Sequence, residues 1–144
     1  MVARMTRTRL IELLRGYKFA VQATVSPTGA PQASVVGFAV TDDLELVFDT
    51  LGATRKATNL RAKPRMALVV WEEGYTIQLE GLADEPTGAE LDRLKRVYFA
   101  RFPDGPERQS WPGMTYVRVR PTWVRASDFR KTPPEIVELD PSQA

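Results

Sequence analysis

The chain has 144 residues, of which 43% are hydrophobic and 26% are charged, a size and composition typical of one compact domain. It contains no cysteine and no histidine, which excludes disulfides, Cys/His metal sites, a thiolate nucleophile, a catalytic-triad base and a histidine ligand for haem. The net charge of +2 is too small to indicate a nucleic-acid partner, and no apolar run approaches the roughly 18 residues that span a bilayer.

The first part of the chain predicts a helix followed by a hairpin. A helix is expected over 6–15, because its leucine and isoleucine side chains share one side and Gly16 follows as a stop signal. Apolar and polar residues alternate over 19–26, which predicts a half-buried strand. The Pro/Gly-rich segment 27–31 then turns the chain into a second β-rich run over 32–40.

The middle of the chain predicts two more strands with a short helix between them. Residues 44–49 alternate again, and a third strand there would complete an antiparallel meander. The segment 54–62 has helical character, with Thr54 as its N-cap and Pro64 preventing its continuation. Residues 66–71 are apolar throughout, as expected of a strand covered on both faces.

A fifth strand and a longer helix come next. The fifth strand is expected over 75–80, where alternation returns, and Gly81 marks a bulge or a bend after it. Thr87 and Glu90 have the spacing of a capping box, and the amphipathic helix that they open ends at Pro103.

A last strand is expected over 115–126, interrupted by Pro121, and we expect 127–144 to form an extended, partly loose tail. Six strands with closely spaced turns and few helices predict a mainly β fold, a closed antiparallel barrel with flanking helices rather than a doubly wound sheet. The chain shows no internal repeat or second composition regime, so residues 1–144 are predicted to form a single domain.

The segment 49–60 is the strongest candidate for chemistry. A loop of small residues leads from a strand into a helix N-terminus that carries Thr54, Arg55 and Lys56. Free backbone N–H groups, the positive end of the helix dipole and two cations all favour a bound phosphate. The same residues also fit the solvated basic face of a surface helix, and the glycine spacing of a Walker loop is missing.

Several short motifs occur here in a characteristic order. They are Thr24-Val25-Ser26, Gly29-Ala30-Pro31-Gln32, Phe48-Asp49-Thr50, Thr54-Arg55-Lys56, Asn59-Leu60, Pro64-Arg65 and Gly81. Together, over about residues 17–126, they resemble the pyridoxamine 5′-phosphate oxidase-like family of FMN-binding split barrels. The resemblance implies a six-stranded split barrel and a homodimer with two FMN sites built across the subunit interface.

The resemblance also implies which residues bind the phosphate end of the cofactor. Arg55 and Lys56 match the family's phosphate-binding pair, and Thr54 matches the hydroxyl beside it. Thr50 matches the residue at the end of the third strand that approaches the cofactor. No catalytic residue is assigned, and no metal ligand is expected.

Two further strands are implicated at the ring end. Ser34, Val35 and Val36 match the second-strand segment that runs along the isoalloxazine ring, where backbone groups can bond the ring's polar edge. Thr76 and Gln78 lie on the fifth strand, which in the family faces the cofactor of the partner subunit. Their assignment depends on the register, because a slip by one residue exchanges the faces of a strand.

The absence of histidine and cysteine agrees with a protein whose redox chemistry resides in a bound flavin. The resulting hypothesis is an FMN-dependent oxidoreductase that transfers hydride at flavin N5 to or from an unknown small substrate, with a nicotinamide as a possible electron donor. The alternatives are a reductase that uses the deazaflavin F420, a non-catalytic flavin-storage module, and a basic helix that meets a nucleic-acid backbone.

Two activities of related barrels are disfavoured. True pyridoxamine phosphate oxidases carry a C-terminal Arg/His substrate motif, whereas this chain ends its last strand with Arg118-Val-Arg120-Pro-Thr-Trp123, and haem-handling members tend to rely on histidine. We expect a cytoplasmic protein without membrane contact, because no secretory signal precedes the first helix and a chain without cysteine suits a reducing compartment.

Overall fold

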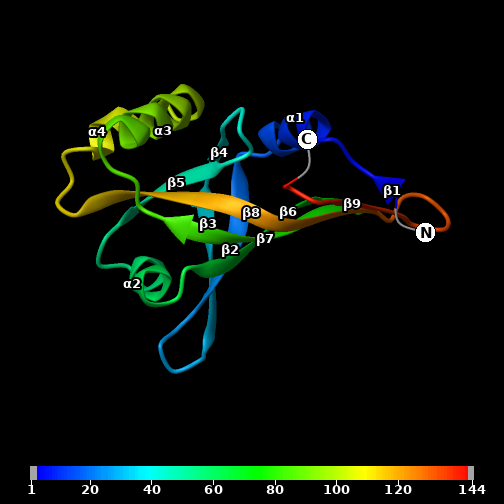
Figure 1. Ribbon diagram of the computed structural model, residues 1–144, viewed down its shortest axis with the longest axis horizontal. Coiled ribbons are helices and arrows are strands. Elements are labelled where there is room, and N and C mark those ends of the chain that lie inside the picture. The colour runs from blue at the N-terminus through cyan, green and yellow to red at the C-terminus, as the bar shows by residue number, and fades with distance from the viewer. Residues whose placement is uncertain (1–2, 143–144) are drawn as a thin grey trace.

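One sheet of nine strands curls through residues 3–142, the part of the chain that the computed structural model describes (Figure 1). The strands are β1 (Ala3–Arg4), β2 (Phe19–Val25), β3 (Pro31–Gly37), β4 (Ala39–Val40), β5 (Leu46–Leu51), β6 (Arg65–Glu72), β7 (Tyr75–Asp84), β8 (Met114–Asp128) and β9 (Glu135–Leu139). The helices are α1 (Arg7–Arg15), α2 (Arg55–Ala62), α3 (Gly88–Arg101) and the short α4 (Gly105–Arg108).

A bend in the chain at Phe38 connects the β2–β3 part of the sheet to the β4–β5 part. Strands pair in the order β9-β8-β7-β6-β2-β3, and β5 pairs with both β8 and β4. The sequence predicts one strand over 32–40, but the chain bends at Phe38, because β3 pairs with β2 whereas β4 pairs with β5. The predicted three-stranded meander is therefore wrong, because the segment 32–40 is divided between two strands with different partners. The predicted six-stranded antiparallel split barrel is confirmed, with β2, β3, β5, β6, β7 and β8 as its long strands.

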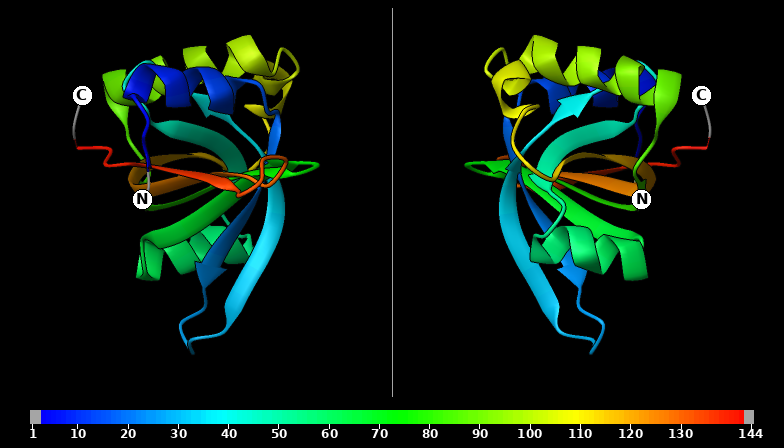
Figure 2. Two further views of the ribbon diagram at one scale, coloured as in Figure 1. Left: turned by 90° about the vertical axis from the view of Figure 1, so that its right-hand side faces the viewer. Right: turned by 90° about the vertical axis from the view of Figure 1, so that its left-hand side faces the viewer.

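The helices begin and end close to where the sequence predicts. Thr6 Oγ1 accepts a hydrogen bond from Arg9 N at 3.1 Å, and Thr54 caps α2. Thr87 precedes α3 but makes no side-chain capping bond, so the predicted capping box does not form. The carboxylate of Glu90 instead accepts hydrogen bonds from two arginines. Figure 2 shows α1 and α3 on one side of the sheet and α2 on the other.

Strand β2 buries its polar side chains together with Ala20, and its other apolar side chains lie on the outer face. Gln22 and Thr24 are 1% and 2% exposed, whereas Phe19, on the opposite face, is 55% exposed. The alternation correctly predicts a half-buried strand. The buried half is polar because the interior of the barrel near α2 supplies hydrogen-bond partners to these side chains.

The outward surface of the neighbouring strands continues this apolar face. Strand β6, expected to be covered on both faces, alternates between buried and accessible residues, and Trp71 is 54% exposed. On β3, Val35 is 61% exposed and lies opposite Val21 of β2. We define the outer apolar face as Phe19, Val21, Ala23, Val35, Ala67, Val69 and Trp71. A contiguous apolar surface of this kind is typical of an interaction site.

The core has two parts, one inside the barrel and one under α3. Strand β5 separates them, since Phe48 faces the barrel interior and Val47 packs with Leu94 and Tyr98 of α3. At the predicted bulge, Gly81 lies opposite Pro121 where the register shifts, and a Cβ on Gly81 would come within 2.7 Å of a backbone oxygen. The bulge lets a proline without an N–H lie inside β8.

The C-terminal segment belongs to the sheet instead of forming a loose tail. Strand β8 continues to Asp128, and β9 pairs antiparallel with β8 and parallel with β1. Of the tail predicted over 127–144, residues 135–139 are extended as expected but are held by two ladders, and the last two residues lie outside the described part of the chain. Among residues 3–142, no helix combines the length and the apolar character that crossing a bilayer requires.

Candidate functional site

The loop between β5 and α2 has a fixed shape. Thr50 and Thr54 share a hydrogen bond of 2.9 Å between their hydroxyls, and Thr54 Oγ1 also accepts from the backbone N–H of Ala57 at 3.4 Å. Gly52 N donates to Gly113 O at 2.7 Å, which attaches the loop to the segment before β8. The predicted residues Thr50 and Thr54 are thus adjacent in space.

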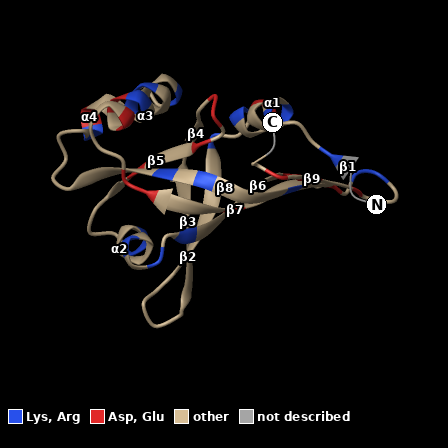
Figure 3. Ribbon diagram, viewed as in Figure 1, with Lys and Arg blue, Asp and Glu red and all other residues tan. Residues whose placement is uncertain are grey.

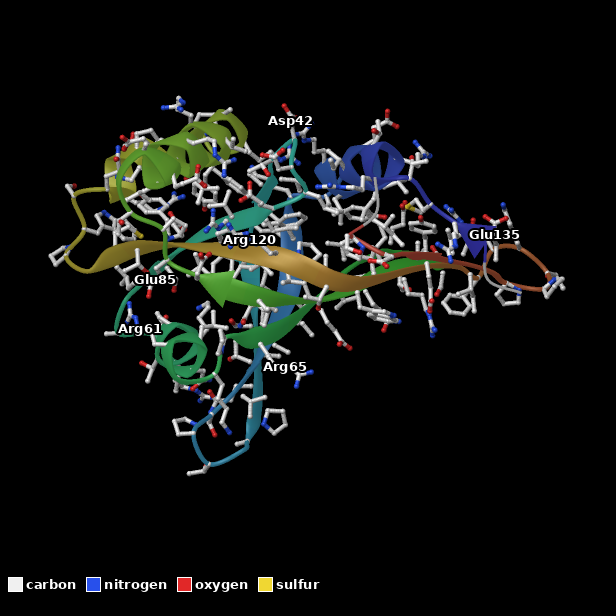
Figure 4. All side chains as sticks on the ribbon, viewed as in Figure 1. Asp42, Arg61, Arg65, Glu85, Arg120 and Glu135 are labelled. Atoms are coloured by element: carbon white, nitrogen blue, oxygen red, sulfur yellow. The ribbon has the colours of Figure 1, made fainter. Side chains whose placement is uncertain are left out.

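Arg61 holds the same loop from the other side. Its Nη1 donates to Gly52 O at 2.7 Å, while Nε and Nη2 donate to the two carboxylate oxygens of Glu85, both at 2.9 Å (Figure 4). The charge of Arg61 is therefore already neutralised by Glu85. This arginine has a structural role in the loop and is not available as a free cation.

Arg55 and Lys56 at the start of α2 have no such partner. Within residues 3–142 neither cation forms an ion pair, and the first turn of α2 contains no acidic residue (Figure 3). Burial lowers the pKa of the half-buried Lys56, because desolvation disfavours its ammonium form. Two uncompensated cations at the positive end of a helix dipole make this position complementary to an anion.

Gln32 orients Arg55. Its Oε1 accepts hydrogen bonds from Arg55 Nε at 3.0 Å and from Asn59 Nδ2 at 2.9 Å, and Asn59 Nδ2 lies 3.0 Å from Thr24 Oγ1. This chain of polar contacts joins β2, β3 and α2. The site prediction missed Gln32, Asn59 and Thr24. All three lie in the motifs quoted above, and the buried polar side of β2 was the missing signal.

A second polar pair, Gln22 and Ser34, lies next to these polar contacts. Gln22 Nε2 donates to Ser34 Oγ at 2.7 Å, and Ser34 is exposed on β3. Gln22 is 1% exposed, and its Oε1 has no hydrogen-bond partner among the residues described. A buried polar atom without a partner is costly, and Gln22 Oε1 can accept one further hydrogen bond.

Strand β3 ends the ladder on one side, so part of its backbone is unpaired. In the described chain it pairs only with β2, and alternate N–H and C=O groups of an edge strand point away from the sheet. Val35 and Val36 lie on opposite faces, 61% and 6% exposed. Because their side chains diverge, the contact predicted for Ser34, Val35 and Val36 can involve all three residues only through the backbone.

Thr76 and Gln78 do not join the residues around α2 within one chain. The ladder order places β6 and β2 between β7 and β3, which separates Gln78 from Val35 by about 14 Å at the usual spacing of strands. Both residues instead border a shallow cleft of about 320 Å³ on the outer apolar face. The predicted site residues therefore form two groups, one at α2 and β3 and one on β7.

The fold defines a split-barrel protein, and the start of α2 carries two cations without an ion-pair partner in the described chain. Residues 8–128 match the family model of pyridoxamine 5′-phosphate oxidase. Because this match covers most of the chain, the chain belongs to the pyridoxamine 5′-phosphate oxidase family.

Similar proteins include enzymes and binding proteins. A pyridoxine/pyridoxamine 5′-phosphate oxidase of Thermosynechococcus vestitus is 35% identical over 91 residues, or 62% of this chain and 41% of that protein. A pyridoxamine 5′-phosphate oxidase-related, FMN-binding protein of Nostoc punctiforme has a TM-score of 0.68, at 17% identity over 90% of this chain and 87% of that one. A haem-binding protein of Mycobacterium smegmatis has a TM-score of 0.81, at 16% identity over 98% and 60% of the chains. The chain thus spans less than half of the curated oxidase that it matches.

Proposed function

We propose that this protein binds FMN, with the phosphate at the N-terminus of α2, and that it acts as a flavin-dependent oxidoreductase on a small substrate. The observation that carries the proposal is the pair Arg55 and Lys56, cations without an ion-pair partner in the described chain at the positive end of a helix. A phosphate would accept from Arg55 in two places, while Lys56 would contribute a point charge.

The residues present fit a flavin better than a haem. The chain has no histidine or cysteine to ligate haem iron, and no cluster of metal-binding side chains is found in residues 3–142. The unpaired backbone edge of β3 and the buried Gln22 Oε1 offer polar groups to a heteroaromatic ring. Bound FMN would supply hydride transfer at its N5 atom, and the protein would supply binding, orientation and exclusion of water.

The proposal includes a homodimer. The outer apolar face, with Val35 61% and Trp71 54% exposed, has the character of a subunit interface. In such a dimer Thr76 and Gln78 would face the cofactor held at α2 of the partner subunit, which accounts for the two separate groups of site residues. A dimer would also place the exposed Ser34 beside a closed pocket instead of open solvent.

We do not propose pyridoxamine phosphate as the substrate. Arg118, in the last strand, is 5% exposed, and Glu45, Asp84 and Glu90 bind its guanidinium. It therefore cannot serve as a free substrate-binding cation. A small uncharged or aromatic substrate agrees better with the residues available.

The test is titration of the purified protein with FMN, followed by flavin fluorescence. Arg55→Ala combined with Lys56→Ala should weaken FMN binding by about 100-fold or more, because it removes two charge-assisted contacts. Lys63→Ala, which removes a charge from the opposite end of α2, is the matched control and should leave the affinity unchanged. Equal FMN affinity in the double variant and the wild type would refute the phosphate assignment.

Two further measurements separate the related alternatives. In a parallel titration F420 should bind more weakly than FMN does. Tighter binding of F420 would instead identify the deazaflavin as the cofactor. Reduction of the bound flavin by a nicotinamide donor should proceed with turnover of added acceptors. A flavin that stays oxidised with every donor would assign the protein to storage.

A further inference from the structure

A second cleft lies far from α2, between the two helices on the other side of the barrel. Helices α1 and α3 flank β4 there (Figures 1 and 2). The cleft has a volume of about 520 Å³, which lies within the range of small-molecule sites. It is lined by Leu14, Arg15, Tyr17, Phe38, Ala39, Val40, Arg96, Val97, Ala100 and Arg101.

The inner wall of this cleft is apolar. Leu14, Phe38 and Val40 belong to the barrel core and are 0%, 1% and 3% exposed. On α3 the wall continues through Val97 and Ala100, which lie on one face of the helix. A ligand entering the cleft would therefore meet the hydrocarbon of Val97 and Ala100, over a floor of buried apolar side chains.

The rim of the cleft is cationic and contains no acid. Arg15 is occupied, since it donates to Val40 O at 2.8 Å and to Asp42 Oδ1 at 2.9 Å. Arg96 and Arg101 form no hydrogen bond or ion pair with any residue in 3–142, whereas their neighbour Arg93 binds Glu45 and Glu90. Arg96 and Arg101 thus offer two guanidinium groups beside an apolar wall.

We propose that this cleft is a binding site for an amphiphilic anion, a carboxylate or sulfonate carried on an apolar body. The anionic group binds Arg96 and Arg101, where bidentate guanidinium contacts are available. The apolar body lies against Val97 and Ala100, over the floor that the buried Leu14, Phe38 and Val40 form. The cleft does not overlap the phosphate position proposed above, because α2 lies on the opposite side of the sheet (Figure 2).

The test uses anilinonaphthalene sulfonate, a fluorescent amphiphilic anion, with FMN-saturated protein, and phenylnaphthylamine as its uncharged counterpart. Arg96→Gln combined with Arg101→Gln should weaken sulfonate binding by about tenfold or more and leave the uncharged probe unaffected. Lys63→Gln combined with Arg65→Gln removes the same charge outside the cleft and should leave both probes unaffected. Ala100→Trp fills the cleft from an exposed helix position and should abolish binding of both.

Thermal melting of each variant establishes that it is folded. Sulfonate binding that survives Ala100→Trp, or that falls equally in both double variants, would overturn the proposal. Competition then identifies the ligand source: displacement of the sulfonate by dodecanoate indicates acyl chains, and displacement by naphthoate alone indicates aromatic acids. Failure of both competitors at millimolar concentration would also overturn it.

Discussion

Gln32 Oε1 accepts a hydrogen bond from Arg55 Nε at 3.0 Å and thereby joins the edge strand β3 to the first residue of α2. The contact uses the side of the guanidinium that carries Nε and leaves both Nη groups for another acceptor. A neutral amide can hold an arginine in this way without neutralising it. Gln32 therefore orients the cation and leaves its charge uncompensated, as the proposed phosphate site requires.

The first prediction follows from the lack of charge on the Gln32 amide. Gln32→Glu keeps the shape of the side chain but places a carboxylate next to Arg55, which would compete with the phosphate. We expect FMN to bind about tenfold more weakly, while riboflavin, which lacks the phosphate, binds as it does to the wild type. Fluorescence titration with both flavins measures the difference. An equal loss for riboflavin would show that Gln32 acts on the ring or on the fold instead.

The second prediction concerns pH and Lys56. Burial lowers the pKa of this lysine, so its ammonium form is lost at a lower pH than that of an exposed lysine. Since the phosphate binds the charged form, FMN affinity should be flat near neutrality and should fall as the pH rises through the lowered pKa. In Lys56→Arg this fall should disappear, because arginine stays protonated. Any ionisation of the flavin affects the wild type and Lys56→Arg equally, so the difference between their affinity curves reports on Lys56. Parallel curves would contradict a contact between Lys56 and the phosphate.

The third prediction tests the outer apolar face. Val35 is 61% exposed in the single chain, so Val35→Glu should leave the fold of one subunit intact. It would place a charge inside the proposed interface, where desolvation is costly. Sedimentation should show a monomer that no longer retains FMN. Trp111→Glu, at a residue 52% exposed outside this face, is the control, and a persistent Val35→Glu dimer would exclude the face as the interface.

The fourth prediction concerns a buried ion pair. Arg118 Nη1 lies 3.2 Å from Glu45 Oε2, and both side chains are less than one-tenth exposed. Arg118→Met should reduce the free energy of unfolding by about 3 kcal/mol, because it leaves a buried carboxylate with fewer partners. Arg120→Met, two residues along the same strand and 59% exposed, should change it by less than about 0.5 kcal/mol. Denaturant unfolding compares them, and equal losses would rule out a special role for the pair.

Local signals in the sequence predict most element boundaries. Gly16 predicts the end of α1, Thr54 and Pro64 predict the limits of α2, and the structure has these limits within a residue. Long-range effects account for the errors. The bend at Phe38 depends on which strands pair, and β9 depends on its ladders with β8 and with β1, which is more than 130 residues away in the chain. Neither pairing leaves a periodic pattern.

Some residues of the candidate site can likewise be predicted from local signals, whereas others depend on long-range contacts. Arg55 and Lys56 are identifiable because a helix start and its charges are adjacent in sequence. Gln32 and Asn59 depend on a contact between β3 and α2, and the polar side of β2 is buried against expectation because these amides satisfy it. The apolar side of β2 faces outward, a placement that local alternation does not distinguish from the reverse.

The pairing of β5 with β8 sets the order in which the molecule can assemble. Thr50 O accepts a hydrogen bond from Thr115 Oγ1, a residue 65 positions later, and the whole length of β5 pairs with this distant strand. During synthesis the loop that carries Thr50 and Thr54 emerges well before the strand that supports it. The supported form of this loop therefore arises only when the ribosome has released nearly the whole domain, and contacts of such high separation slow folding.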